Sequence, residues 1–328
     1  MKQFLRKNNI YKQLRQLYYN YKAYNFWQKN TNVRIHNFLL HPAPQDYWLQ
    51  EFIVYRNLLQ NSNKKISIFS VFGSKEMIHL NRDDIKIFIA RENIHREQWT
   101  DYADNCLDVS SINLSLGYDY VDSERYMRFP LWIMWLFPPT VDYEYIKEWC
   151  DRINHPNNSS FDNRKFCAFL CSHDDVGRRE VYEQLSSIDR VDCDGRLFHN
   201  NDELKQIYSD DKLRYLQHYR FNLCPENSQA HGYVTEKLFE AIASGCIPIY
   251  CGNEGCPPES DILNSDAILF VDMSGDNTKT LKQVSELNSN KEAYAQFAMR
   301  PRLKPDAAER IWSYIQELNQ RLIALIEA

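Results

Sequence analysis

The sequence lacks the segments that hold a protein in a membrane or send it out of the cell. No run of about 18 apolar residues occurs, so no membrane-spanning helix is predicted. The N-terminus has no apolar core of the kind found in signal peptides. There is no CxxC pair, and the nine cysteines lie mostly in or beside apolar segments. We therefore expect buried free thiols, no metal site and a cytoplasmic location.

Three common active-site motifs are also absent. No GxxxxGK[ST] occurs, no GxGxxG follows a predicted strand, and no GxSxG is found. These absences disfavour a P-loop enzyme, a nicotinamide-dependent dehydrogenase and a hydrolase with a nucleophile elbow. The tripeptide Asp192-Cys193-Asp194 resembles the metal-binding Asp-x-Asp of some sugar transferases. Because Gly195 follows it in a predicted turn, we interpret it as a loop.

The first 45 residues contain eight lysines and arginines but no acidic residue, whereas the whole chain of 328 residues has a net charge of −5. A net acidic chain is not a general nucleic-acid binder. Residues 1–30 are expected to form a basic amphipathic helix, with one apolar face made of Ile10, Leu14, Leu17, Tyr18, Tyr21 and Tyr24. Such a helix either lies on an anionic membrane, giving peripheral attachment, or packs on its own domain.

Short apolar segments alternate with helical patterns, which is typical of parallel sheets in α/β domains. We predict two Rossmann-like, doubly wound domains facing across a cleft, residues 31–155 and 156–300, followed by a C-terminal helix in 301–328. The polar stretch 152–164 is the predicted linker. Pro248 favours an irregular or edge position for the strand 246–251. The predicted strands are Val33–Leu39, Ile66–Val71, Ile85–Ala90, Ile112–Leu116, Lys165–Cys171, Phe221–Cys224, Cys246–Cys251 and Ala267–Val271, and a short one is expected to begin at Val191.

Polar clusters follow three of these strands, at residues 90–96, 172–180 and 225–237. In open α/β sheets, ligands bind beyond the carboxyl ends of the strands. Together the clusters offer a carboxylate, arginines and a lysine at a helix N-terminus. These groups suit a general base and a diphosphate leaving group that is neutralised without an obligatory metal.

Lys237 lies in the first turn of a helix expected to begin at Thr235, where a cation opposes the helix dipole by up to ~1 kcal/mol. One explanation is a diphosphate bound nearby. The other is a surface lysine paired with Glu236 or Glu240. Thr235 itself is expected to cap the helix, and Gly245 is expected to end it in a left-handed conformation.

The segment "YRFNLCPENSQAHGYVTEKLFEAIASGCIPIYCG", residues 219–252, resembles the signature of the α-1,3-fucosyltransferases, glycosyltransferase family 10. "RENI", "ERYMRFPLW" (124–132) and "FLCSHDDVGRREVYEQLSSI" (169–188) add to this resemblance, which extends over about residues 85–275. The sequence has Pro225 where the family usually has Phe, and Gly232 where many animal members have Asp.

The resemblance implies a GT-B fold and inverting transfer of L-fucose from GDP-fucose. The implied acceptor is the 3-hydroxyl of N-acetylglucosamine in a galactosyl-N-acetylglucosamine unit, as in Lewis-type or lipopolysaccharide glycans. Mn²⁺ or Mg²⁺ would at most stimulate turnover. The roles that it implies are a catalytic base for Glu92, diphosphate contacts for Arg178 and Lys237, a ribose contact for Glu236, and further donor contacts for Asn227 and Tyr233.

Rival interpretations remain open. The same fold could serve another sugar nucleotide or acceptor, or a sugar-nucleotide-binding protein without catalysis. An unrelated nucleotide enzyme is disfavoured by the missing glycine motifs. His95 is the nearest rival to Glu92 as base, since its unperturbed pKa suits the role. Glu124 is a second rival, but Arg125 and Arg128 beside it favour ion pairing.

Overall fold

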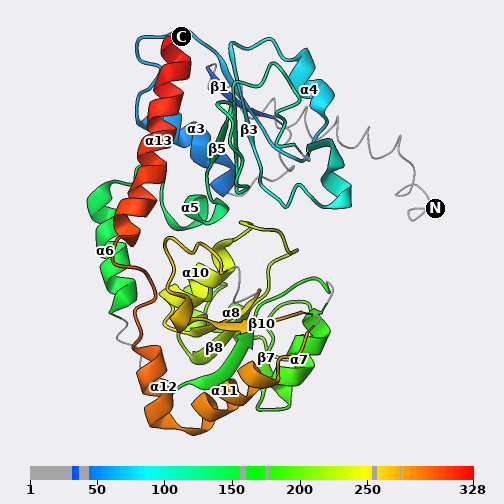
Figure 1. Cartoon of the computed structure of the whole chain (residues 1–328), viewed down its shortest axis with the longest axis vertical. Coiled ribbons are helices and arrows are strands. Elements are labelled where there is room, and N and C mark those ends of the chain that lie inside the picture. Colours follow the sequence, from blue (N-terminus) through cyan, green and yellow to red (C-terminus); the bar gives the residue numbers. More distant parts are fainter. Residues whose placement is uncertain are drawn as a thin grey trace, which may run out of the picture. The chain divides into compact units, whose positions relative to one another are not determined.

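The computed structural model describes residues 32–36, 44–102, 104–155, 160–174, 177–252, 257–273 and 275–328. The helix predicted within residues 1–30 lies outside these ranges. The chain forms two compact units (Figure 1). Unit 1 runs to Val141 and adds Ser313–Ala328, and unit 2 is Asp142–Trp312.

Unit 1 contains a parallel five-stranded sheet in the order β1-β2-β3-β4-β5. Every residue of β2 and β3 is buried, as expected for strands covered on both faces. The strands are β1 (Val33–His36), β2 (Ile66–Phe69), β3 (Ile85–Ile89), β4 (Leu114–Gly117) and β5 (Tyr126–Arg128). The helices are η1 (Pro44–Tyr47), α3 (Trp48–Tyr55), α4 (Lys75–Leu80), η2 (Glu97–Tyr102), α5 (Leu131–Leu136) and the last part of α13 (Ala307–Glu327).

Unit 2 contains a second parallel five-stranded sheet, in the order β10-β9-β8-β6-β7. Its strands are β6 (Lys165–Phe169), β7 (Val191–Asp192), β8 (Tyr219–Cys224), β9 (Ile247–Cys251) and β10 (Leu269–Val271). Its helices are α6 (Tyr143–Asn154), α7 (Arg178–Ser186), α8 (Glu203–Gln206), α9 (Lys212–Leu216), α10 (Glu236–Ala243), η3 (Ser265–Ala267), α11 (Thr278–Ser289), α12 (Lys291–Ala298) and the first part of α13.

The strand order of unit 2 reverses between β6 and β8. From β6 the chain goes outward to β7, returns to the other side of β6 as β8, and then continues to β9 and β10. This is the 2-1-3-4-5 order of doubly wound sheets, which bind ligands at the point of reversal. The described strands of unit 1 instead follow one another in sequence order. The loops after β6 and β8 are therefore where a ligand site of unit 2 is expected.

The nine predicted strands are all present, including the short one at Val191, with ends that differ by a few residues. Strand β5 was not predicted, because its three residues are too short for a pattern. The prediction for Pro248 was wrong, since β9 pairs with both β8 and β10. The pairing with β10 begins only at Ile249, so the missing N–H of Pro248 lies outside that ladder.

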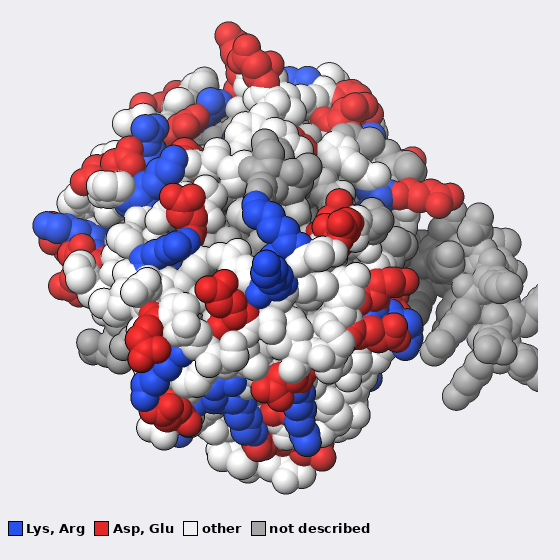
Figure 2. All heavy atoms as spheres, turned by 60° about the horizontal axis from the view of Figure 1, so that its bottom comes forward, with Lys and Arg blue, Asp and Glu red and all other residues white. Residues whose placement is uncertain are grey.

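The eight described cysteines are free and buried, as predicted. In the part of the chain that the structure describes, no helix is long and apolar enough to cross a membrane. Figure 2 shows lysines and arginines interspersed with aspartates and glutamates on the face that it presents. No single-sign patch covers that face.

Candidate functional site

The loop after β6 ends at Gly177, which places the first turn of α7 at the edge of the unit 2 sheet. Gly177 has φ +83°, a left-handed conformation that glycine adopts without strain. A Cβ there would come within 2.2 Å of the carbonyl oxygen of Met273, in the loop after β10. Two loops at the carboxyl edge of the sheet therefore pack directly against each other at a residue without a side chain.

Arg178 is the first residue of α7 and only 1% of it is exposed. Its Nη1 donates to the carbonyl oxygen of His173 at 2.6 Å and to Cys171 Sγ at 2.8 Å. Its Nη2 donates to the carbonyl oxygen of Glu226 at 2.6 Å. The guanidinium thus connects the loop after β6 to the loop after β8, across the point where the strand order reverses.

The loop after β8 turns back at Gly232 to start α10. The N–H of Tyr233 donates to the carbonyl oxygen of Ala230 at 3.1 Å, and Gly232 between them has φ +80°. A positive φ at the third residue is the requirement of a type II turn, which explains a glycine there. Tyr233 is 3% exposed, and Asn227 is half-buried in the same loop.

Glu226 holds the N-terminus of α10. Both of its carboxylate oxygens accept hydrogen bonds from Thr235, one from the N–H at 2.8 Å and one from the hydroxyl at 2.6 Å. Thr235 occupies the predicted N-cap position, but its side chain makes no capping bond to the helix. Burial raises the pKa of Glu226, and the charge of Lys237 together with the bonds from Thr235 opposes that rise.

Lys237 lies against this carboxylate. Its Nζ is 3.0 Å from Thr235 Oγ1, 3.5 Å from Glu226 Oε2 and 3.7 Å from Glu236 Oε1, and its side chain is 21% exposed. Burial lowers the pKa of Lys237, but the two carboxylates outweigh it and the pKa lies above its ordinary value. Lys237 is therefore paired with Glu236, as one of the two explanations expected, and with Glu226. It is not a surface lysine, and Glu240 instead pairs with Lys212 at 3.4 Å.

The predicted donor residues thus fall into two groups. Arg178, Glu236 and Lys237 come together around Glu226, at the first turns of α7 and α10. Asn227 and Tyr233 line the connecting loop. Two cations, Arg178 and Lys237, and two carboxylates, Glu226 and Glu236, therefore lie beside the N-termini of α7 and α10.

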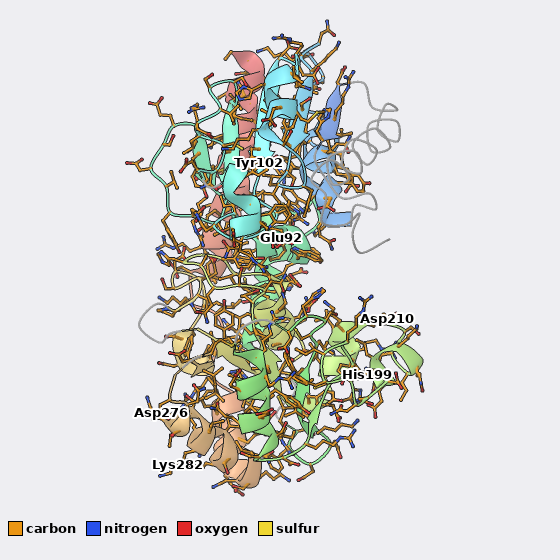
Figure 3. All side chains as sticks on the ribbon, turned by 90° about the vertical axis from the view of Figure 1, so that its right-hand side faces the viewer. Glu92, Tyr102, His199, Asp210, Asp276 and Lys282 are labelled. Atoms are coloured by element: carbon orange, nitrogen blue, oxygen red, sulfur yellow. The ribbon has the colours of Figure 1, made fainter. Side chains whose placement is uncertain are left out.

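In unit 1, Glu92 follows β3 and is half-buried, and Figure 3 shows it in the loop at that end of the strand. Its neighbours are fixed on both sides. Arg91 Nε is 3.0 Å from Asp46 Oδ1 with both side chains 6% exposed. Asn93 Oδ1 accepts from the Tyr118 hydroxyl at 2.8 Å. The backbone of Glu92 therefore lies between two residues whose side chains are anchored.

The two rival bases differ from each other in their surroundings. His95 Nε2 is 2.7 Å from Asp119 Oδ1, and its side chain is 45% exposed. Glu124 is exposed and makes no salt bridge in the described ranges. The ion pairing expected for Glu124 was wrong, because Arg125 and Arg128 donate to backbone carbonyl oxygens instead.

Asp192 is the second residue of β7, so the interpretation of residues 192–194 as a loop was wrong for it. It belongs to a network at the edge of the sheet. It accepts from Arg190 Nε at 2.6 Å and from the Tyr219 hydroxyl at 2.9 Å, and it lies 3.4 Å from Lys165 Nζ. Asp194 accepts from the N–H of Leu204 at 3.1 Å. Among the described residues, no three His, Cys, Asp or Glu side chains lie where they could hold a metal ion together.

Sequence reasoning missed Glu226, Asn93 and Asp119. Glu226 stands in the quoted E-N-S element, yet its partner Thr235 lies nine residues away across a turn. Asn93 and Asp119 come from the ends of different strands. A signal existed only for Glu226, which is a carboxylate that directly follows an apolar strand and Pro225.

Two family models match the chain. "Glycosyltransferase family 10 (fucosyltransferase) C-term" matches residues 161–315, and "Alpha-(1,3)-fucosyltransferase FucT N-terminal domain" matches residues 13–135. Alpha-(1,3)-fucosyltransferase FucT of Helicobacter pylori is 29% identical over 205 residues, which are 55% of this chain and 41% of the relative. Alpha-(1,3)-fucosyltransferase B of Drosophila melanogaster is 26% identical over 184 residues, 53% of this chain and 40% of the relative.

These alignments span about two fifths of the length of both relatives. A crystal structure of an α1,3-fucosyltransferase matches with a TM-score of 0.59 at 18% identity, covering 89% of each chain. A structure described as α1,3-fucosyltransferase with GDP-fucose matches with a TM-score of 0.55 at 20% identity, covering 85% of this chain and 87% of that one. At this identity the likeness shows a shared fold, the GT-B fold predicted from the sequence.

Proposed function

The chain belongs to glycosyltransferase family 10, and from this premise we propose that it transfers L-fucose from GDP-fucose to a glycan. The observation that carries the proposal is the joining of Arg178 and Lys237 through Glu226, where the strand order of unit 2 reverses. Two cations beside two helix N-termini suit the diphosphate of a sugar nucleotide. The similar α1,3-fucosyltransferase structure with GDP-fucose supports this choice of donor.

The proposed donor contacts follow from this arrangement. Lys237 and Arg178 bind the diphosphate and stabilise GDP as it leaves. Nη1 and Nη2 of Arg178 already donate to His173, Cys171 and Glu226. Arg178 therefore contributes to diphosphate binding through its positive charge and by fixing the shape of the two loops, as well as by direct contact. Glu236 accepts from the ribose hydroxyls, and Asn227 and Tyr233 complete the donor site.

The proposed reaction is direct displacement with inversion. Glu92 takes the proton of the attacking hydroxyl while GDP leaves from the other side of the sugar. A sugar hydroxyl has a pKa far above 7, so the attack needs a base within ~2.6–3.2 Å of that oxygen. We propose the 3-hydroxyl of N-acetylglucosamine in a Lewis-type or lipopolysaccharide glycan as the acceptor.

The deciding experiment is incubation with GDP-fucose and a panel of small acceptors, with products read by mass. A gain of one fucosyl residue on Gal-GlcNAc, with the linkage assigned by NMR, is the expected result. GDP-mannose and UDP-sugars serve as donor controls. Transfer from one of these, with none from GDP-fucose, would overturn the donor assignment.

The proposal includes turnover without an obligatory metal, because the two cations can neutralise the diphosphate. Activity is expected to persist in EDTA, with Mn²⁺ or Mg²⁺ at most increasing its rate. Complete loss in EDTA that either metal restores would contradict this, and would direct attention back to Asp192 and Asp194.

A further inference from the structure

His95 and Asp119 form a pair to which the proposed function gives no task. The imidazole Nε2 lies 2.7 Å from Asp119 Oδ1, and Asp119 Oδ2 accepts from Asn105 Nδ2 at 2.8 Å. The N–H of His95 donates to Asn93 Oδ1 at 3.1 Å. The ring lies edge-on to that of Tyr118, with centroids 6.1 Å apart. Three contacts therefore hold the histidine: one at its backbone N–H, one at a ring nitrogen and one between its ring and that of Tyr118.

The residues that support this pair are themselves buried. Asn93 and Asn105 are each 3% exposed, and the Asp119 side chain is 13% exposed. Asn105 and Cys106 both have positive φ, at 51° and 57°, which is a conformation that non-glycine residues rarely adopt. Such strain persists where the surroundings hold it, and it gathers at functional sites.

The second histidine–aspartate pair in the described ranges provides a contrast. His199 Nε2 lies 3.1 Å from Asp202 Oδ1 in unit 2, where both side chains are exposed, at 47% and 63%. The two histidines are about equally exposed, so the pairs differ in their aspartates: the Asp119 side chain is 13% exposed and that of Asp202 is 63% exposed.

The arrangement fixes which ring nitrogen of His95 is available. In the neutral ring, when Nε2 donates its proton to Asp119, Nδ1 is an acceptor. No side chain in the described part of the chain is hydrogen-bonded to Nδ1, and 45% of the side chain is exposed. Burial together with the charges of Asp119 and Glu92 raises the pKa of Tyr118, so all three groups are near neighbours. A partly exposed histidine with an acceptor nitrogen is thus held on the loop that carries the proposed base.

Resting on the proposed function, we propose that His95 binds the acceptor glycan through Nδ1. It accepts a hydrogen bond from an acceptor hydroxyl other than the one that reacts, while Asp119 is a positioning residue. Asp119 sets the tautomer and direction of the ring, and Asn105 holds Asp119. No proton leaves the hydroxyl in this contact, because Glu92 takes the proton of the reacting hydroxyl.

The proposal separates acceptor binding from chemistry. Removal of one hydrogen bond to a substrate that is bound equally in the ground and transition states raises KM and leaves kcat unchanged. A typical hydrogen bond corresponds to roughly a tenfold change in KM. If the pair had only a structural role, its mutation would change the stability of the protein instead. If His95 were the base, its mutation would change kcat.

The test measures kcat and KM for a Gal-GlcNAc acceptor in four variants. His95→Leu and Asp119→Asn are expected to raise the acceptor KM by about tenfold with kcat within about twofold of the wild type. His95→Asn keeps an acceptor atom near the position of Nδ1 and should recover most of the affinity. Asp202→Asn is the matched control, since it breaks the other histidine–aspartate pair, and its KM should equal that of the wild type.

Calorimetry with GDP and with the disaccharide alone gives readouts that do not depend on turnover. Unchanged GDP affinity in all four variants shows that unit 2 is intact. A wild-type KM in His95→Leu, or a collapse of kcat at unchanged KM, overturns the acceptor role. Absence of any fucosyl transfer by the wild-type protein is a different result, because it refutes the proposed function itself.

Discussion

At the scale of single residues, the charges of the candidate site are arranged in pairs that the sequence shows only in part. The pattern of polar residues after strands indicated the clusters, and the family resemblance implied roles within them for Arg178, Glu236 and Lys237. Neither indicated that Arg178 and Lys237 share Glu226 as a partner, because burial of a carboxylate and its contacts nine residues away depend on how the loop folds. Local pattern can indicate which end of a strand carries function, but not which side chains there contact each other.

The proposed base gives the most direct residue-scale prediction. Glu92→Gln keeps the shape of the side chain and removes its ability to take a proton. We expect kcat to fall by roughly 10²–10⁴-fold, with GDP affinity and unfolding midpoint unchanged. Steady-state kinetics and calorimetry with GDP provide the measurements. Normal turnover in this variant together with loss in His95→Ala would identify His95 as the base.

Glu226 and Lys237 give a second prediction. Glu226→Gln removes the charge that compensates Lys237 and weakens the hold on Thr235, so we expect a loss of about 1–3 kcal/mol in the free energy of unfolding. Lys237→Ala should instead weaken GDP binding by roughly tenfold or more. Urea unfolding and calorimetry measure the two effects.

Glu240→Gln is the matched control for Glu226→Gln, because Glu240 is a partly buried carboxylate of α10, the helix that Glu226 holds, and it pairs with Lys212 instead. Its effect on GDP affinity should be small. If Lys237→Ala binds GDP as tightly as the wild type, the lysine has only the structural partners described above and no role in holding the diphosphate.

His36 gives a prediction for pH. Burial lowers its pKa from 6.5 to about 4, while its Nε2 lies 3.1 Å from Ser67 Oγ. Because the unfolded chain binds the proton more readily, His36 favours the folded state above pH 6.5, and this contribution is lost as the pH falls from about 6.5 to 4. The loss is at most about 3 kcal/mol.

Unfolding by urea at several pH values measures this effect. His36→Gln cannot titrate and should lose stability less steeply across that window, whereas His79→Gln, a change at an exposed histidine of α4, should retain the slope of the wild type. Equal slopes in all three proteins would show that other groups cause the acid sensitivity.

At the scale of elements, apolar runs and glycines predicted the structure well where an element depends only on residues that are close together in the sequence. The strands of both sheets could be placed because buried parallel strands are continuous apolar segments. Gly245 was expected to end α10 in a left-handed conformation, and it does, at φ +77°. The bonds from Gly245 to Ile242 and from Cys246 to Ala241 are those of a Schellman motif.

Prediction failed where an element depends on its neighbours. Strand β5 forms because β4 offers an edge to pair with, and Pro248 is accepted in β9 because β10 begins to pair one residue later. Neither fact is present in the local pattern. The close contact of the loops after β6 and β10 at Gly177 is likewise a property of the assembled sheet.

Gly177 gives the element-scale prediction. Gly177→Ala adds a Cβ 2.2 Å from the Met273 carbonyl oxygen at a residue with φ +83°, so one of the two loops must move. We expect a loss of more than about 1 kcal/mol in stability and weaker GDP binding. Ser186→Ala, at an exposed position of the same helix, should change neither. A fully stable Gly177→Ala variant would show that the loop contact is not required.

At the scale of the whole molecule, charge is distributed unevenly between the first residues and the rest. The acid-free segment at the beginning of the chain carries eight positive charges, and the remainder is acidic. We propose that residues 1–30 attach the protein to anionic membrane, where a lipid-linked glycan would be presented. Basic residues near such a surface contribute on the order of 1 kcal/mol each, decreasing with salt.

Deletion of residues 1–30 should therefore abolish co-sedimentation with phosphatidylserine-containing vesicles at low salt, while turnover of a soluble acceptor is retained. Vesicles of phosphatidylcholine alone serve as the control surface. Failure of the full-length protein to bind anionic vesicles at low salt would show that this segment has another task.

Helix α10 is held at both ends by buried charges from other parts of unit 2. Glu226 holds its first turn through Thr235, and Arg164 donates to the carbonyl oxygens of Ser244 and Gly245 at 3.0 and 2.9 Å. Each end meets the charge that its dipole favours. Loss of one residue from the helix would rotate one end relative to the other by about 100° and shorten it by about 1.5 Å. The number of residues between Thr235 and Ser244 is therefore not free to vary. Insertions and deletions during the divergence of such sequences should collect in the loops and spare this helix.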